Sequence, residues 1–156
     1  MPPENPPEAS AGETLYGWGA NEELLVEALY PYPDEVLITT KVGVVPPEPP
    51  REAALCGRPE VLRDQVEQAL RRLRVDRLDL LQLHRIDPEV PPADQVGTLG
   101  ELQADGKIGH IGLSEVTAAE LDQARQLVDV AGVIASAALR LSDDQRSRLN
   151  AARPRV

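Results

Sequence analysis

The chain has 156 residues, which is enough for one globular domain with a buried core. Its hydrophobic content of 42% excludes a wholly disordered chain, and the absence of Phe predicts an aliphatic core. The formal net charge of −10 argues against nonspecific binding to nucleic acid or anionic membranes, which requires clustered Lys and Arg.

The sequence also bears on the cellular compartment. Cys56 is the single cysteine, which excludes an intramolecular disulfide and suits a reducing compartment. No apolar run is long enough for a membrane span. The first residues are acidic and proline-rich, where a secretory signal would be basic and then apolar. We therefore expect a soluble cytoplasmic protein.

The N-terminal segment predicts a leader followed by a helix. Residues 1–13 are rich in Pro and Glu and have no hydrophobic period, so we expect them to be disordered. The globular domain would then span 14–156. Asn21 is the predicted N-cap of the first helix, and Pro31 stops that helix.

The next segment predicts a strand, a long loop and an amphipathic helix. Residues 35–40 (EVLITT) are β-branched and predict a strand that ends at Lys41. The proline-rich stretch 42–56 reads as a loop. Pro59 suits the first turn of a helix, whose apolar residues recur at helical spacing to about Arg74.

The central segment predicts a second strand and a second amphipathic helix. Residues 78–84 (LDLLQLH) are almost continuously apolar, which is typical of a parallel strand that is buried on both faces. A proline-rich loop at 87–92 leads into a helix over 93–104, and Gly106 ends it.

The C-terminal third is less clearly patterned. Residues 108–114 (IGHIGLS) predict a third strand, and the capping box at 117–120 opens a helix that runs to Leu127. Residues 130–139 are small and apolar, which suits either a weak fourth strand or a loop into a helix. A second capping box at 142–145 begins a short final helix.

Strands and helices alternate along the chain. This alternation predicts a parallel sheet with right-handed crossovers. A (β/α) barrel and a doubly wound sheet are both compatible with it.

Polar residues stand at the ends of three successive predicted strands. Lys41, His84 and Ser114 would meet because the carboxyl ends of parallel strands lie along one edge. Taken singly, Lys41 could be a solvated strand end, His84 a satisfied histidine and Ser114 the cap of a turn. Together they predict a site, and Tyr16, in a glycine-flanked loop, is a fourth candidate.

Tyr, Lys and His side chains together suit proton transfer to or from an oxygen atom. A phenol has a pKa of about 10 and is a poor acid at neutral pH unless its anion is stabilised. A nearby ammonium lowers that pKa, and an imidazole can orient a carbonyl group or relay a proton.

Several stretches resemble the aldo/keto reductase family, over about residues 15–127. The most specific is RPEVLRDQVEQALRRLRVDRLDLLQLHRID, at residues 58–87. The shorter matches are YG at 16–17, NEELLVEAL at 21–29, ITTKVG at 38–43 and DGKIGHIGLSEV at 105–116.

The resemblance implies a (β/α)8 barrel that reduces aldehydes and ketones with NADPH. By motif position, Tyr16 would be the proton donor, Lys41 would lower its pKa, and His84 would lie at the substrate carbonyl. Ser114 would contact the nicotinamide carboxamide, with Glu115 beside it where the family usually has asparagine. The implied partners are this cofactor and a small-molecule carbonyl substrate, without a metal.

The sequence departs from the family pattern towards both ends. The family's aspartate lies five residues before the tyrosine, where this chain has Ala11. A complete barrel needs roughly 250 residues. After Leu127 the chain runs into a stretch, AALRLSDDQRSRL, that resembles the tail of the family. We therefore expect a partial (β/α)8 barrel with three parallel strands, truncated at both ends.

A partial barrel has two unpaired sheet edges and an exposed apolar inner face. Two hypotheses follow from this. The chain is either an NADP-dependent aldo/keto reductase-like enzyme, or a catalytically inactive remnant or interaction module that self-associates through its open edges.

Overall fold

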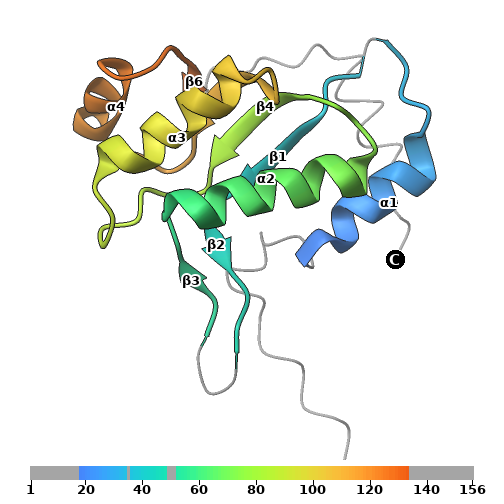
Figure 1. Cartoon of the computed structure of the whole chain (residues 1–156), viewed down its shortest axis with the longest axis horizontal. Helices are drawn as coiled ribbons and strands as arrows, with labels where there is room; N and C mark the ends of the chain where they lie inside the picture. The colour runs from blue at the N-terminus through green and yellow to red at the C-terminus, as the bar shows by residue number, and fades with distance from the viewer. Residues whose placement is uncertain (1–17, 35, 49–51, 134–156) are drawn as a thin grey trace, which may run out of the picture.

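The structure is a computed structural model that describes residues 18–34, 36–48 and 52–133. Within this part of the chain, helices alternate with strands (Figure 1). The predicted leader, Tyr16 and the capping box at 142–145 lie outside the described residues. None of the described helices is long and apolar enough to cross a bilayer.

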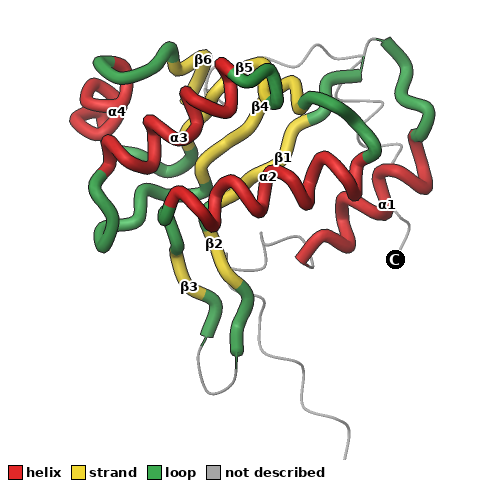
Figure 2. Tube along the Cα trace, in the orientation of Figure 1, coloured by secondary structure: helices red, strands yellow, loops and turns green. Residues whose placement is uncertain are grey.

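Four strands form a parallel sheet in the order β1-β4-β5-β6. Helices α2 and α3 lie along one face of this sheet (Figures 1 and 2). The strands of the sheet are β1 (Thr39–Val42), β4 (Leu78–Leu83), β5 (Ile108–Leu113) and β6 (Val130–Val133). The other elements are α1 (Ala20–Leu29), β2 (Val44–Val45), β3 (Ala54–Leu55), α2 (Pro59–Leu73), α3 (Pro92–Ala104) and α4 (Ala118–Arg125).

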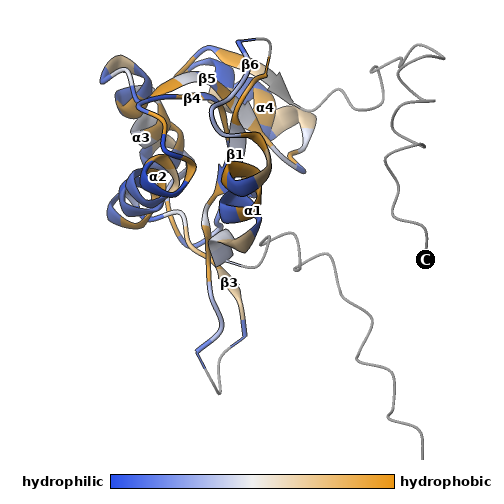
Figure 3. Cartoon of the chain, turned by 90° about the vertical axis from the view of Figure 1, so that its right-hand side faces the viewer, coloured by the Kyte–Doolittle hydropathy of each residue, from blue (hydrophilic) through white to orange (hydrophobic). Residues whose placement is uncertain are grey.

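The core is aliphatic, as the composition predicts. Leu81 and Leu83 of β4 are fully buried together with Leu62 and Leu73 of α2 and Leu99 of α3. These residues belong to one cluster that joins the sheet to the helices. Hydrophilic residues occupy the side of α2 that is turned away from the sheet (Figure 3). The amphipathic pattern of α2 therefore directs its apolar side chains towards β4.

The strand register aligns side chains in rows across the sheet. Lys41 of β1 lies opposite Gln82 of β4, and Gln82 lies opposite Gly112 of β5. Residues two apart in a strand face the same way. His84 and Ser114 therefore continue the face of Lys41, one step towards the carboxyl edge.

Four elements of the sheet and its helices agree closely with the sequence prediction. Helices α2 and α3 and strands β4 and β5 each begin and end within one residue of the expected bounds. The weak fourth strand is also present as β6. The described sheet therefore has four parallel strands, where the sequence predicted three.

Helix caps show one wrong prediction and one confirmed prediction. Helix α1 begins at Ala20, and its N-cap is Gly19 rather than Asn21. Gly19 has φ 104°, a left-handed conformation that glycine adopts at little cost. In α4 the predicted capping box is present: Thr117 Oγ1 accepts from the Glu120 N–H at 3.2 Å, and the Glu120 carboxylate accepts from the Thr117 N–H at 2.7 Å.

Strand β1 lies further along the chain than the predicted strand at 35–40. The ladder with β4 begins at Thr39, because the Ile38 N–H donates instead to Asp79 Oδ2 at 2.7 Å. Lys41 is therefore inside the strand and held by its ladder, rather than following it.

The predicted loop at 42–56 contains a hairpin, β2–β3, in which Val44 pairs with Leu55. The hairpin extends away from the sheet and helices (Figure 1). Gln65 of α2 fixes its first residues: Gln65 Oε1 accepts from the Gly43 N–H at 2.8 Å, and Gln65 Nε2 donates to the Val44 carbonyl at 2.6 Å. The pairing was not predicted because prolines dominate the segment and each strand has only two residues.

Glu22 fastens α1 to the rest of the domain. Its side chain is nearly buried, and its carboxylate accepts from Thr40 Oγ1 at 2.7 Å and from Arg72 Nε at 2.6 Å. These contacts join α1 to β1 and α2. A carboxylate that is removed from water needs such donors, because an unpaired buried charge is costly.

We expect Arg72→Met to lower the free energy of unfolding by about 2 kcal/mol, because Glu22 would keep its buried charge without its strongest donor. Adding Glu22→Gln should recover part of this loss. The matched control is Arg63→Met, which removes an exposed ion pair with Glu101 and should cost less than about 1 kcal/mol. Urea denaturation measures all three variants. Equal losses for Arg72→Met and Arg63→Met would show that Glu22 is not a buried charge of this kind.

Candidate functional site

The structure places three of the predicted site residues at one edge of the parallel sheet. Lys41 lies within β1. His84 directly follows β4 and donates its N–H to the Val42 carbonyl at 2.8 Å. Ser114 directly follows β5 and donates its N–H to the Leu83 carbonyl at 3.1 Å. The hydrogen-bonded ladder thus continues through both residues, and it holds His84 beside the end of β1 and Ser114 beside the end of β4. Tyr16 lies outside the described residues.

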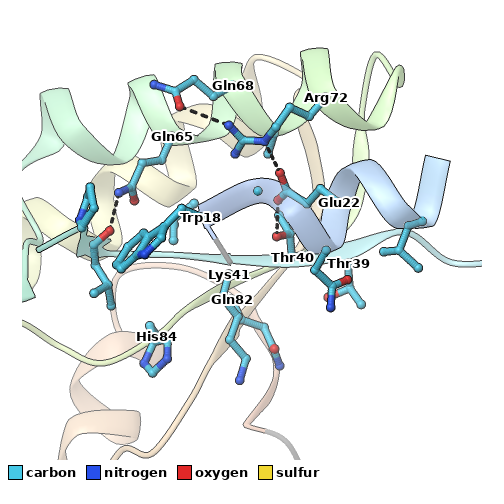
Figure 4. A pocket seen from close by; sticks show the side chains of 17 residues that line it. Trp18, Glu22, Thr39, Thr40, Lys41, Gln65, Gln68, Arg72, Gln82 and His84 are labelled. Atoms are coloured by element: carbon cyan, nitrogen blue, oxygen red, sulfur yellow. Dashed lines mark hydrogen bonds and ion pairs between the residues drawn. The ribbon is translucent and has the colours of Figure 1, made fainter. Parts of the chain in front are cut away.

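A pocket of about 300 Å³ includes Lys41 and His84 in its lining, together with Gln82 and Trp18. Figure 4 shows Lys41, Gln82 and His84 on one side of β1, with Arg72 and the other α2 residues on the opposite side. The pocket therefore reaches around the edge of β1. Within the residues that the structure describes, no group of three His, Cys, Asp or Glu side chains is placed to hold a metal ion.

Sequence reasoning did not single out Gln82 or Trp18. Gln82 is 7% exposed and lies beside Lys41 in the strand register. The signal for Gln82 was present, because it is a polar residue between two leucines and stands two positions before His84, on the same face of the strand. Trp18 precedes α1 in the sequence, and only the packing of α1 against α2 brings it to the pocket.

His84 has an environment that favours the neutral imidazole. Burial lowers its pKa below the ordinary value of about 6.5, and the positive charges of Lys41 and Arg85 lower it further, while Glu115 opposes them. A histidine whose pKa is lower in the folded state contributes stability above its unfolded pKa and loses it as the pH falls from there through its folded pKa. His84 therefore favours the folded state above about pH 6.5 relative to more acidic conditions.

Ser114 and Glu115 form the end of β5 at the same edge. Ser114 is buried, whereas the side chain of Glu115 is about half exposed and forms an ion pair with Arg85. Glu115 has φ 52°, in the left-handed region that asparagine enters more readily than glutamate. The backbone therefore keeps a conformation that suits the asparagine of the family motif, and the ion pair with Arg85 restrains the glutamate side chain there.

The aldo/keto reductase family pattern matches residues 13–151. The chain belongs to this family. An uncharacterised oxidoreductase from Schizosaccharomyces pombe is 46% identical to it over 118 residues, which cover 76% of this chain and 38% of the yeast protein. This aldo/keto reductase chain thus spans well under half the length of the relatives it matches.

Two solved structures show the same relation. A glycerol dehydrogenase from Gluconobacter oxydans superposes with a TM-score of 0.70 at 33% identity, covering 76% of this chain and 37% of that one. An aldo/keto reductase from Klebsiella pneumoniae, solved in complex with NADP and acetate, has a TM-score of 0.58 at 25% identity and covers 74% and 36%. The predictions of the family and of a partial (β/α)8 barrel are confirmed.

We expect the pKa of His84 to lie below 6.5 and to rise when Lys41 is replaced by Met, because the ammonium would no longer oppose a second positive charge. The chain has only two histidines, so a His110→Asn background leaves one imidazole signal for proton NMR. Titrating that signal in the single and double variants measures the shift. An unchanged or lower pKa after Lys41→Met would contradict the electrostatic coupling of the two residues.

Proposed function

We propose that this chain carries part of the active site of an NADPH-dependent reductase that converts an aldehyde or ketone to an alcohol. The observation that carries the proposal is the position of Lys41 and His84, from neighbouring parallel strands, in the lining of one pocket. Membership of the aldo/keto reductase family supports it. The related Klebsiella pneumoniae structure, which contains NADP, supports the choice of cofactor.

The residues at the end of β5 fit a carboxamide group. NADPH supplies the hydride when it is bound. The Ser114 hydroxyl can donate or accept a hydrogen bond, and the Glu115 carboxylate can accept one from an amide N–H. Arg85 restrains that carboxylate at the sheet edge. We therefore assign Ser114 and Glu115 to the nicotinamide end of the cofactor site.

The remaining roles concern one proton and one carbonyl oxygen. Tyr16 is the proposed proton donor to that oxygen, and the Lys41 ammonium is the group that would lower its pKa. His84, kept neutral at pH 7 by its lowered pKa, can donate one hydrogen bond that orients the substrate carbonyl. A carbonyl oxygen bound beside Lys41 and His84 would meet hydrogen-bond donors from both side chains.

The compartment that suits this chemistry is the cytoplasm. Cys56 is buried and is a free thiol, which agrees with a reducing environment. We therefore propose that the protein is located in the cytoplasm and uses NADPH there.

Association through the sheet edges is the second candidate function, for a chain without catalytic activity. Within the described residues, β1 and β6 stand at the two ends of the parallel sheet. Leu37, just before β1, is 75% exposed, and Leu24 of α1 is 62% exposed. Exposed leucines beside an edge strand favour contact with another chain.

We expect the purified protein to bind NADPH, measured by cofactor fluorescence, and to oxidise it in the presence of a small aldehyde. Tyr16→Phe should lower the rate by at least about 100-fold, because general acid catalysis contributes that much or more. The matched control is Tyr30→Phe, which removes an exposed phenol outside the pocket and should leave the rate unchanged. Failure to bind cofactor at millimolar concentration would end the reductase proposal, and an unchanged rate in Tyr16→Phe would exclude Tyr16 as the acid.

For the second candidate, sedimentation should show a concentration-dependent dimer, and Leu37→Asp should weaken it by placing a charge beside the β1 edge. Gln123→Asp adds the same charge on the exposed surface of α4 and should have no effect. A monodisperse monomer at all concentrations would exclude edge-mediated association.

A further inference from the structure

A buried polar network lies behind the strand end that carries His84. Gln95 of α3 is fully buried, and both the oxygen and the nitrogen of its side-chain amide form hydrogen bonds. Its Oε1 accepts from the Asp87 N–H at 2.9 Å, and its Nε2 donates to the carbonyls of Asp87 at 2.9 Å and Val90 at 2.6 Å. The loop that follows β4 is therefore fastened to α3 by three hydrogen bonds from one side chain.

Asp87 extends this network to the hairpin. Its side chain is buried, and its two carboxylate oxygens accept from different backbone groups. Oδ2 accepts from the Gly57 N–H at 2.8 Å, and Oδ1 accepts from the Glu89 N–H at 2.9 Å. The segment after β3 is thus hydrogen-bonded to the loop that follows β4.

Backbone hydrogen bonds close these contacts into a ring. Cys56, next to Gly57, donates its N–H to the Gly43 carbonyl at 2.9 Å. Val42, next to Gly43, accepts from the His84 N–H at 2.8 Å. The ring runs from His84 through Asp87 to the hairpin exit and back through the end of β1. Lys41 is the residue before Val42, so the ring spans the two strands that carry the site.

We propose that Asp87 is a positioning residue, which holds the His84 imidazole relative to Lys41 by tying the end of β4 to the base of the hairpin. This proposal rests on the proposed function, because Asp87 would act through His84 and Lys41, which the proposed function assigns to the active site. Asp87 does not line the pocket, so it would act through His84.

The chemistry of the ring explains why a carboxylate stands at this position. Two backbone N–H groups point at Asp87 from separate segments, and only a carboxylate offers an acceptor oxygen to each without a competing donor. Asparagine has the same shape, but its NH2 group would face one of these N–H groups. Asp87→Asn can turn that NH2 group towards Glu89 and keep the hydrogen bond from Gly57, whereas Asp87→Ala removes both acceptors and opens the ring.

The packing around the ring leaves little room for adjustment. A Cβ atom on Gly57 would lie 2.2 Å from Gln95 Oε1, and the Gln95 side chain is held in place by its three hydrogen bonds. Close contact between buried groups transmits small displacements. A change at Asp87 should therefore reach His84 through the ring instead of being absorbed locally.

The test is the pKa of His84 by proton NMR in the His110→Asn background, measured with Asp87 in place and with Asp87→Ala. The matched control is Glu89→Ala, which removes the same charge from an exposed side chain in the same loop. Loss of a negative charge alone lowers the pKa of a nearby imidazole. Loss of positioning would expose the partly buried imidazole to water and move it away from the Lys41 ammonium, so it should raise the pKa of His84 by about 0.5 or more towards 6.5.

A raised pKa in Asp87→Ala, with no rise in Glu89→Ala, supports the proposal. An unchanged or lowered pKa in Asp87→Ala overturns it. These measurements need neither cofactor nor turnover, so a failure of this proposal is distinguishable from a failure of the reductase proposal, which NADPH binding tests.

Hydrogen exchange provides a second measurement. It uses the protein with Asp87 in place, so it does not require a substituted protein to fold. If the ring opens as one unit, the amide hydrogens of Gly57 and His84 should show protection within about tenfold of each other. Exchange of the Gly57 amide more than about 100-fold faster than that of His84 would show that the hairpin base moves independently, and would also overturn the proposal.

Discussion

Strand β4 hydrogen-bonds to β1 along one side and to β5 along the other, and all three strands run in the same direction. Parallel pairing brings their carboxyl ends to one edge, which is where Lys41, His84 and Ser114 lie. The register then decides which residues share a face. A shift of one residue in β4 would turn His84 towards the helices, because neighbouring residues in a strand face opposite ways.

Three polar contacts, one buried and two partly buried, hold the surrounding elements to this sheet. Glu22 ties α1 to β1 and α2, Gln65 fixes the start of the hairpin, and Asp87 joins the hairpin exit to the loop after β4. Each one satisfies charged or backbone groups that would otherwise be buried without partners. Aliphatic side chains can pack in many orientations. These hydrogen bonds therefore help to fix how the helices and the hairpin are oriented relative to the sheet.

The site shows how charge and burial act together on one residue. His84 is partly buried at a strand end and lies near Lys41 and Arg85, and all of these lower its pKa. Glu115 draws Arg85 into an ion pair at the rim, which links the ends of β4 and β5. The edge of the sheet therefore combines a partly buried imidazole with the charges of Lys41, Arg85 and Glu115.

Local patterns predicted the elements whose causes are local. The helical spacing of α2, the apolar run of β4 and the capping box of α4 all appear in the structure near the predicted residues. The same patterns predicted the parallel sheet and the strand ends that carry Lys41, His84 and Ser114. The predicted cap at Asn21 was wrong. The helix begins at Ala20, after Gly19, whose left-handed backbone forms the N-cap without a side-chain hydrogen bond.

The sequence by itself determined the alternation of strands and helices, the resemblance to a reductase family and the polar residues at the strand ends, because these depend on residue order and spacing. Only the tertiary structure decided that β1 begins at Thr39, that a hairpin interrupts the loop, that Asp87 holds the hairpin exit, and that Trp18 lines the pocket. Each of these depends on a partner that is distant in the sequence, such as Asp79 for Ile38 or Gly57 for Asp87. Contacts of that kind form only when the chain folds and brings separate segments within hydrogen-bonding distance.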